Sequence, residues 1–263
     1  MLVVKLGGAA GNDADSVLDE LPRHQPLVLV HGGSEEVDRL GERLGAPARY
    51  FTSPSGTVSR YTDPAGMEVL TMALAGKVNT GLVARLQGKG VRAFGLSGLD
   101  GGLVVGRRKE GARAVENGRT VRVTNDYSAA IDHVDPRPLT TLLSAGYLPV
   151  VGPPALTATG ETVNVDADRM AAAIAVALHA DALVLLSNVP GLLRDPSDPT
   201  SRVDEFVAAD SEPFLALAHG RMRKKVLAAC EAVRQGVGRS IIAASRADDP
   251  IAAALRGQGT VVR

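Results

Sequence analysis

The sequence predicts a mainly parallel α/β/α sandwich. Continuous apolar runs of strand length, several of them ending in Gly, alternate with segments whose apolar residues recur every three or four positions. Such alternation is typical of a parallel sheet covered by helices on both faces. With 263 residues, 45% of them apolar, the chain can form one large domain or two closely joined lobes.

The first half contains three predicted strands and two predicted helices. We expect strands at Leu2–Leu6, Leu27–Val30 and Val91–Gly95, and a helix at Val37–Leu44. A longer helix is predicted over Pro64–Gln87, because five apolar residues in it form one stripe: Met67, Leu70, Leu74, Val78 and Leu82. The stripe either belongs entirely to the core or also forms a two-fold interface.

Residues 103–123 are predicted to form a basic hairpin. The extended segments Leu103–Val105 and Thr120–Val123 flank Asn117-Gly118, a dipeptide typical of hairpin turns. Six basic and two acidic residues lie here, a local charge of +4 in a chain with 29 of each sign. The basic residues are Arg107, Arg108, Lys109, Arg113, Arg119 and Arg122. The hairpin is either a solvated surface element or a docking site for an acidic partner, for which we consider Arg107, Arg108 and Lys109.

The second half continues the alternation. We expect strands at Tyr147–Val151, Ala182–Leu186 and Ser240–Ala243, and helices at Asp166–Ala180, Arg221–Gln235 and Pro250–Leu255. In open α/β sheets ligands bind at the carboxyl ends of the strands. The predicted site therefore lies where the Gly turns are.

Three separate segments indicate a phosphate-handling site. Two strands end in Gly-Gly, at Gly7-Gly8 and Gly32-Gly33, and each precedes a segment expected to be helical. Such turns let backbone N–H groups and a helix N-terminus approach an anion, although Gly also occurs in these turns for geometry alone. Lys5 and Lys225, at opposite ends of the chain, could neutralise a phosphoryl group in transfer.

The segment from Asn164 to Asp168 and the side chain of Arg60 could complete this site. Asp168 lies in the sequence Asn164-Val165-Asp166-Ala167-Asp168, which is either an acidic N-cap cluster or a group that orients lysines while Asn164 contacts substrate. Arg60 is expected in a loop before the long helix. It could bind a carboxylate through two hydrogen bonds, or it could be an ordinary surface arginine.

Composition excludes several other classes of protein. The chain contains no G-x-x-x-x-G-K-[ST] segment, no G-x-G-x-x-G segment and no Cys/His spacing for zinc. Its net charge of zero argues against a general nucleic-acid or membrane-surface binder. It lacks an apolar stretch of the roughly 18 residues that a transmembrane helix needs. The single Cys230 fits a reducing compartment, so we expect a cytoplasmic protein.

Together, these segments resemble the amino acid kinase family, and within it the acylated amino acid kinases. The resemblance covers the whole chain. It implies an open, mostly parallel sheet of about eight strands, and phosphorylation of a carboxylate by ATP with Mg²⁺, the metal being held mainly by the nucleotide phosphates. No protein metal site is expected. A site with lysines, Gly N–H groups and no obvious base suits a nucleophile that is already ionised.

The resemblance also implies roles for individual residues. Lys5 and Lys225 would stabilise the transferring phosphoryl group, and Asp168 would hold both lysines. The substrate would be bound by Gly32, Gly33, Arg60 and Asn164, and the nucleotide by Gly7, Gly8, Ser187 and Asn188. Lys224 competes with Lys225 for the second lysine role. The chain departs from the acetylglutamate kinases at Asn188, where an Asp is common.

Within the family, the chain is more similar to kinases whose substrate is linked to a carrier protein than to those that act on free N-acetylglutamate. The features are Ser34 after Gly32-Gly33, the segment from Gly56 to Asp63, and the basic hairpin. An acidic amino-group carrier protein is therefore the expected partner, and the acceptor is aminoadipate or glutamate. The resemblance further implies a homodimer, with a substrate lobe and dimer interface at 1–165 and a nucleotide lobe at 166–263.

Overall fold

The computed structural model describes residues 1–9, 11–54, 58–108, 111, 113–116 and 119–263, and within them a central sheet of eight strands. Its order is β14 (Glu205–Phe206), β16 (Thr260–Val262), β15 (Ser240–Ala244), β13 (Ala182–Ser187), β1 (Leu2–Leu6), β2 (Leu27–His31), β10 (Leu148–Gly152) and β5 (Ala93–Ser97). All neighbours are parallel except β15 and β16. The predicted fold class is confirmed.

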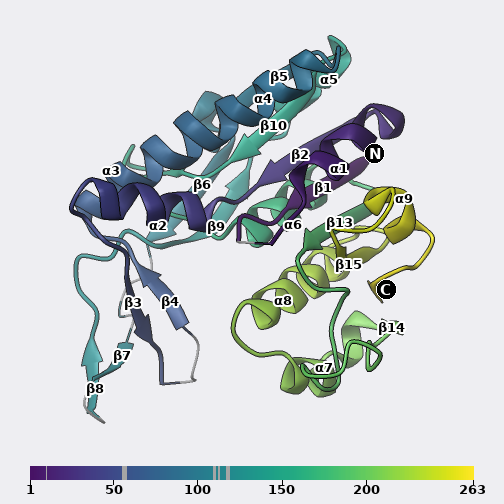
Figure 1. Ribbon diagram of the computed structural model, residues 1–263. Helices are drawn as coiled ribbons and strands as arrows, with labels where there is room; N and C mark the ends of the chain where they lie inside the picture. Colours follow the sequence, from purple (N-terminus) through teal and green to yellow (C-terminus); the bar gives the residue numbers. More distant parts are fainter. Residues whose placement is uncertain (10, 55–57, 109–110, 112, 117–118) are drawn as a thin grey trace.

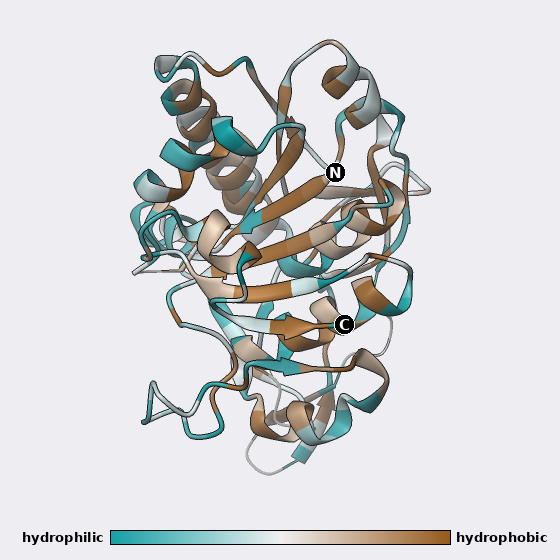
Figure 2. Cartoon of the chain, turned by 90° about the vertical axis from the view of Figure 1, so that its right-hand side faces the viewer, coloured by the Kyte–Doolittle hydropathy of each residue, from teal (hydrophilic) through white to brown (hydrophobic). Residues whose placement is uncertain are grey.

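Helices cover both faces of this sheet (Figure 1). On one face, side chains of α1 (Ala14–Glu20), α4 (Asn79–Gly88) and α9 (Pro250–Leu255) share an apolar cluster with the strands. On the other face, α5 (Arg137–Ser144), α6 (Ala167–Ala177) and α8 (Gly220–Arg234) share a second cluster. Figure 2 shows the apolar strands enclosed between these helices. Burial of both faces explains why the strands are continuous apolar runs.

Side chains of a strand alternate between the two faces, and this alternation places the first functional groups. In β1, Leu2, Val4 and Leu6 contact the cluster that includes α4, whereas Val3 contacts the cluster that includes α6. Lys5 therefore faces α6. In β2, His31 follows Leu27 and Leu29 and faces α4.

The predicted long helix is present as one helical run with a π segment in its middle. It consists of α3 (Pro64–Thr71), the π segment η2 (Met72–Val78) and α4. Four residues of its apolar stripe, Met67, Leu70, Leu74 and Leu82, are buried at 2–6% exposure in the chain's own core. Any two-fold interface on this helical run therefore uses another face of it.

A second sheet covers part of the α6 face. It has the order β12 (Thr162–Val163), β11 (Ala155–Thr157), β6 (Val104–Arg108) and β9 (Ala129–Val134). The predicted hairpin was too wide, because fully buried Val104 belongs to β6 and pairs with β9. The hairpin consists of β7 (Arg113–Glu116) and β8 (Arg119–Arg122). Its Asn117-Gly118 turn and Lys109 lie outside the described residues.

Other elements were not predicted. A two-stranded ribbon is formed by β3 (Arg49–Thr52) and β4 (Val58–Tyr61), which corrects the expectation that Arg60 lies in a loop. The remaining helices of the described chain are α2 (Ser34–Arg43), which was predicted, and α7 (Glu212–Leu217), which was not. The division at residue 165 falls just before α6 and remains a prediction, since one core cluster includes both Val3 and Val226.

Candidate active site

An ion triad lies at the carboxyl end of β1. Lys5 Nζ is 2.7 Å from Asp168 Oδ1, and Lys225 Nζ is 2.9 Å from Asp168 Oδ2. Asp168 lies in the first turn of α6, and Lys225 lies in the second turn of α8. The three residues are only 5–8% exposed. Lys225 rather than Lys224 contacts Asp168, as the preferred assignment requires.

The ionised form of Asp168 is stabilised by the two ammonium groups of this triad. Burial alone would raise the pKa of Asp168, but Lys225 and Lys5 together hold that pKa well below its ordinary value. Burial lowers the pKa of Lys225, and the neighbouring Lys5 adds to this effect while Asp168 opposes it. With all three groups ionised, the triad carries one net positive charge (two minus one). This excess charge is oriented and poorly solvated, which suits an anion in transfer.

The two Gly turns lie against each other beside the triad. A Cβ on Gly8 would be 1.9 Å from the Gly33 nitrogen, and one on Gly33 would be 2.5 Å from Leu74 Cδ2. Glu35 N donates to Gly8 O at 3.1 Å, so the first turn is joined to the start of α2. Among the described residues, the N–H groups of Gly8 and Gly33 have no acceptor. They are therefore available to an anion at the N-terminus of α2.

Arg60 reaches the same helix N-terminus from β4. Its Nη2 donates to Ser34 O at 3.4 Å, to Asp38 Oδ1 and to Tyr50 Oη. All these bonds come from one nitrogen, so the described residues leave the other side of the guanidinium fork without an acceptor. Sequence reasoning did not identify Asp38 and Tyr50, because they join the site only through the unpredicted β3–β4 ribbon.

Asn164 lies next to this ribbon. Its Nδ2 donates to Thr62 Oγ1 at 3.1 Å, and Thr62 is two residues from Arg60. The backbone of Asn164 pairs with Tyr127 and Ala129. The structure thus brings the predicted substrate residues Arg60, Asn164, Gly32 and Gly33 to one end of the sheet.

The residues predicted to bind nucleotide lie on the other side of β1. Gly7 N donates to Leu186 O at 3.0 Å and joins the ends of β1 and β13. Ser187 ends β13, is 3% exposed, and has a hydroxyl without a hydrogen-bond partner in the described structure. A Cβ on Gly11 would be 3.6 Å from Asn188 Cβ. Gly7, Gly11, Ser187 and Asn188 thus surround the junction of β1 and β13.

The arginines considered for docking have different surroundings. Arg107 is exposed and pairs with Asp132 at 3.1 Å. Arg108 is partly buried, pairs with Glu161 at 3.0 Å, donates to Asp126 O and lies 4.0 Å from the centre of the Tyr127 ring. Arg108 therefore holds β6 to the following loops, whatever else it does.

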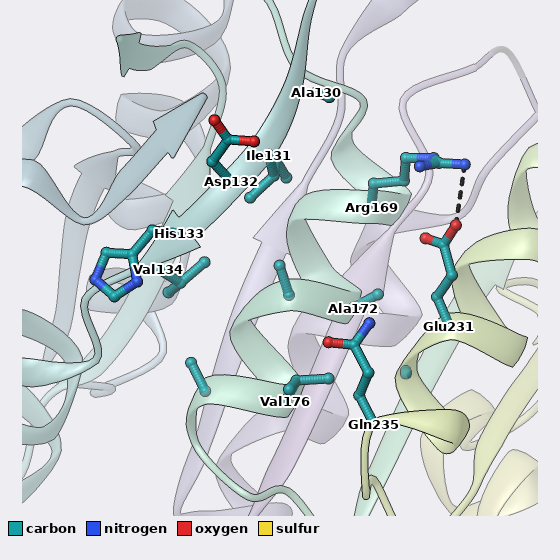
Figure 3. Close-up of a pocket in the computed structure, with 13 residues that line it drawn as sticks. Ala130, Ile131, Asp132, His133, Val134, Arg169, Ala172, Val176, Glu231 and Gln235 are labelled. Atoms are coloured by element: carbon teal, nitrogen blue, oxygen red, sulfur yellow. Dashed lines mark ion pairs between the residues drawn. The ribbon is translucent and has the colours of Figure 1, made fainter. Parts of the chain in front are cut away.

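A cavity of about 320 Å³ lies apart from the triad, between β9, α6 and α8 (Figure 3). Its charged residues Arg169 and Glu231 already pair at 3.1 Å. The cavity contains neither lysine of the triad, so it is not the candidate active site. In the described part of the chain, no three His, Cys, Asp or Glu residues are grouped to hold a metal ion, and no helix is long and apolar enough to cross a membrane.

Comparison with known proteins decides the family. The model of the amino acid kinase family matches residues 1–244. The chain belongs to the amino acid kinase family. The match includes Lys5, both Gly turns, Asp168 and Lys225, so all parts of the candidate site lie inside it.

Two named relatives of this amino acid kinase align with it over its full length. It is 50% identical over 266 residues to a protein of Deinococcus radiodurans and 48% identical over 269 residues to one of Thermus thermophilus, both named "[LysW]-aminoadipate kinase". These alignments cover 100% of this chain and 91% and 100% of the relatives. In fold it is similar to the crystal structure of smu.665 from Streptococcus mutans, with a TM-score of 0.79, 24% identity, and coverage of 99% of this chain and 97% of the other.

Proposed function

We propose that this chain phosphorylates the side-chain carboxylate of 2-aminoadipate linked to a LysW-type carrier protein, with ATP as donor, to form an acyl phosphate in lysine biosynthesis. Two relatives with that name are about half identical to it over its whole length. The single structural observation that carries the proposal is the buried triad of Lys5, Asp168 and Lys225 beside two Gly turns.

The acceptor needs charge neutralisation more than it needs a base. A carboxylate is already ionised near neutral pH, so it can attack phosphorus directly. The barrier comes from repulsion between two anions and from their alignment. In the proposed mechanism Lys5 and Lys225 neutralise the transferring oxygens, and Asp168 keeps both ammonium groups in place.

ATP would supply the phosphoryl group, and the site fits a polyphosphate. The approach between Gly8 and Gly33 leaves no room for a side chain, and both N–H groups are available. In the proposed arrangement Gly33 N–H and Gly8 N–H contact the transferring phosphoryl, while Gly7, Ser187 and Asn188 line the nucleotide side. Mg²⁺ would be held mainly by the nucleotide phosphates, as is usual for this ion at phosphoryl-transfer sites.

Arg60 and Asn164 would bind the backbone end of the aminoadipate, with Gly32 beside it. The unused side of the Arg60 guanidinium can donate to a carboxylate or carbonyl oxygen without displacing Asp38. Asp38 and Tyr50 then fix the direction of Arg60, which would set the distance between the anchored end of the substrate and the triad.

The carrier protein would dock on the β7–β8 hairpin. Arg113 and Arg122 are exposed and directly opposite each other in this ribbon. Like charges at such positions are destabilising, so an acidic partner would relieve their repulsion. Exposed Arg119 and Arg107 would extend the basic surface, whereas Arg108 is committed to internal contacts. The proposal also includes a homodimer and a cytoplasmic location.

The deciding assay measures ADP formation by the purified chain with three acceptors. Carrier-linked aminoadipate should support ADP formation, and free N-acetylglutamate should be a poor acceptor. Carrier-linked glutamate tests whether the site also takes the shorter side chain. Lys5→Ala is the inactive control and Lys224→Ala the matched active one. Equal turnover with free N-acetylglutamate would contradict the role of the carrier.

A further inference from the structure

Two buried polar residues, His31 and Asn79, contact neither lysine of the triad nor Arg60. His31 contacts the Gly32–Gly33 peptide group, whose N–H is proposed above to bind the phosphoryl group, and Asn79 contacts His31. His31 is 1% exposed and Asn79 is 5% exposed. They lie on the α4 side of the sheet, opposite to Lys5 and Asp168. The inference about them rests on the proposed function, because it concerns the Gly33 N–H group assigned there to the phosphoryl.

The first step is the bond between His31 and the peptide that follows it. His31 Nδ1 is 3.0 Å from Gly32 O. In a planar trans peptide the C=O and N–H bonds point in opposite directions. Holding Gly32 O toward the imidazole therefore turns Gly33 N–H away from the imidazole, and the Gly33 nitrogen itself lies against Gly8. Gly32 N donates to Leu6 O at 3.1 Å and fixes the preceding peptide as well.

The second step is the bond that holds the ring. Asn79 Nδ2 is 3.0 Å from His31 Nε2, 2.9 Å from Val150 O and 3.1 Å from Leu96 O. The two carbonyl oxygens can only accept, so the amide nitrogen faces them and donates. The amide has two N–H groups for three acceptors, so one N–H is shared. Because Asn79 Nδ2 cannot accept a proton from Nε2 and Gly32 O can only accept, the neutral tautomer with its proton on Nδ1 fits both contacts of the ring.

Two glycines on neighbouring strands make room for this arrangement. A Cβ on Gly152 of β10 would be 2.3 Å from His31 Cε1, and one on Gly95 of β5 would be 2.1 Å from Asn79 Oδ1. Any other residue would displace the ring or the amide. The contacts thus run from α4 past β5 and β10 to the end of β2, and they end at the Gly32–Gly33 peptide.

The imidazole performs this task without adding charge. Burial lowers the pKa of His31 to about 4, the bond to Gly32 O opposes that shift, and nearby Lys5 contributes to it. At neutral pH the ring is therefore a neutral donor and acceptor. A lysine at this place would bring a third positive charge beside the triad.

We propose that His31 and Asn79 are positioning residues that aim the Gly33 N–H at the transferring phosphoryl group. The donor is then prealigned before ATP arrives, which is the condition under which a backbone donor lowers a barrier most. Only some side chains can perform this role. The side chain needs a hydrogen-bond donor at the Nδ1 position and a group that the Asn79 amide can contact.

The test compares three substitutions in the full-length enzyme. His31→Leu removes the donor, His31→Asn keeps a donor close to the Nδ1 position, and Asn79→Ala releases the ring. Exposed His133→Leu on β9 is the matched control. Loss of one preorganised donor costs about a hundredfold or more in rate, so a misdirected donor should lower kcat roughly tenfold to a hundredfold in His31→Leu. KM for ATP should change little, His31→Asn should recover most of kcat, and Asn79→Ala should lie between them.

A second measurement does not depend on the acceptor. NMR of chain labelled with ¹⁵N in His and Gly should show His31 as the Nδ1-protonated neutral tautomer, and a Gly33 amide signal that responds to a nonhydrolysable ATP analogue in the wild type but not in His31→Leu. Wild-type kcat in folded His31→Leu, equally slow His31→Asn and His31→Leu, or an Nε2-protonated His31 would each overturn the proposal. Failure of the proposed function would appear instead in the wild type, as an absence of ADP formation with carrier-linked aminoadipate.

Discussion

At the scale of single residues, Asp168 has the largest consequences, because one carboxylate serves two lysines. Removing either lysine leaves Asp168 with the other as its partner. Removing Asp168 would leave two buried ammonium groups without a counter-ion, which is strongly destabilising. Substitutions of the lysines therefore report on catalysis more cleanly than substitutions of Asp168.

Lys225→Ala should lower kcat by about a hundredfold or more, since one preorganised charge at a developing anion contributes on the order of 3 kcal/mol. Steady-state kinetics and thermal unfolding should be measured together with Lys224→Ala, whose side chain makes no ion pair within the described chain. We expect both variants to fold and only Lys225→Ala to be slow. Full activity in Lys225→Ala with loss in Lys224→Ala would reverse the assignment.

The burial of His31 predicts that the free energy of unfolding depends on pH. Its pKa is about 4 in the folded chain and near the ordinary 6.5 when unfolded, so below pH 6.5 the unfolded state binds more protons. The contribution of His31 is complete above pH 6.5 and is lost as pH falls toward 4, by about 3 kcal/mol in total.

Urea unfolding between pH 4.5 and 7.5 measures this directly. The free energy of unfolding should fall more steeply with decreasing pH in the wild type than in His31→Asn, which cannot titrate. The same carboxylates are present in both chains, so the difference isolates His31. Parallel curves would show that His31 is not buried in its neutral form.

At the scale of elements, the β7–β8 hairpin is the most unusual feature. It projects beside the β3–β4 ribbon, away from the central sheet (Figure 1). Steering between exposed charges is screened within about 10 Å at 0.1 M salt and acts mainly on the association rate. Charge reversal here should therefore affect capture of the carrier and leave phosphoryl transfer intact.

Arg113→Glu with Arg122→Glu should raise KM for the carrier-linked substrate, with little change in kcat or in KM for ATP. Added salt should weaken the wild type in the same direction. The matched control is Arg43→Glu with Arg256→Glu, which changes the net charge equally at two other exposed arginines. Arg107→Glu can be added to the series, but Arg108→Glu would also break the contacts of β6. Identical kinetics across a salt series would make the hairpin a simple solvated element.

Six of the eight strands of the central sheet were predictable, because burial on both faces makes their apolar pattern continuous. The short strands β14 and β16 and helix α5 were missed. Pro250–Leu255 was placed to the residue. The ribbon that carries Arg60 could not be predicted, because its strands are mostly half-exposed or exposed and their polar residues do not alternate. The second sheet was missed for a related reason, since β11 and β12 have only three and two residues.

The triad itself was predictable only as a set of residue types. Lys5, Asp168 and Lys225 each sit next to a recognisable Gly turn or helix start, but nothing in their spacing brings them within ion-pair distance. Asn79 could not be assigned a role at all. Its three acceptors come from β2, β5 and β10, whose order in the sheet is a property of the fold rather than of local sequence.

At the scale of the whole molecule, the proposed homodimer has to use surfaces that the core leaves free. Four of the five residues of the predicted stripe are buried, but Met72 in the π segment and Phe94 on edge strand β5 are each 43% exposed. Phe94 contacts the Tyr147 ring on the face of the sheet that α5 covers, whereas Met72 lies on the helical run, so the two residues are separate candidates for contacts across an interface.

Light scattering coupled to size exclusion should give twice the chain mass at micromolar concentration. Met72→Glu with Phe94→Glu should shift the chain toward the monomer, whereas Leu44→Glu with Val207→Glu, at two other exposed apolar residues, should not. A wild-type monomer or a hexamer would contradict the proposal.

The central position of β1 also determines when the sheet can form during synthesis of the chain. Its residues pair on one side with β2 but on the other with β13, and the partners Leu2 and Ala182 are 180 positions apart. At about 5–20 residues per second, a ribosome needs roughly 10 to 40 seconds to make that stretch. Throughout this time the edge of β1 that pairs with β13 has no native neighbour. The kinase site also needs Lys225, so it can form only late in synthesis.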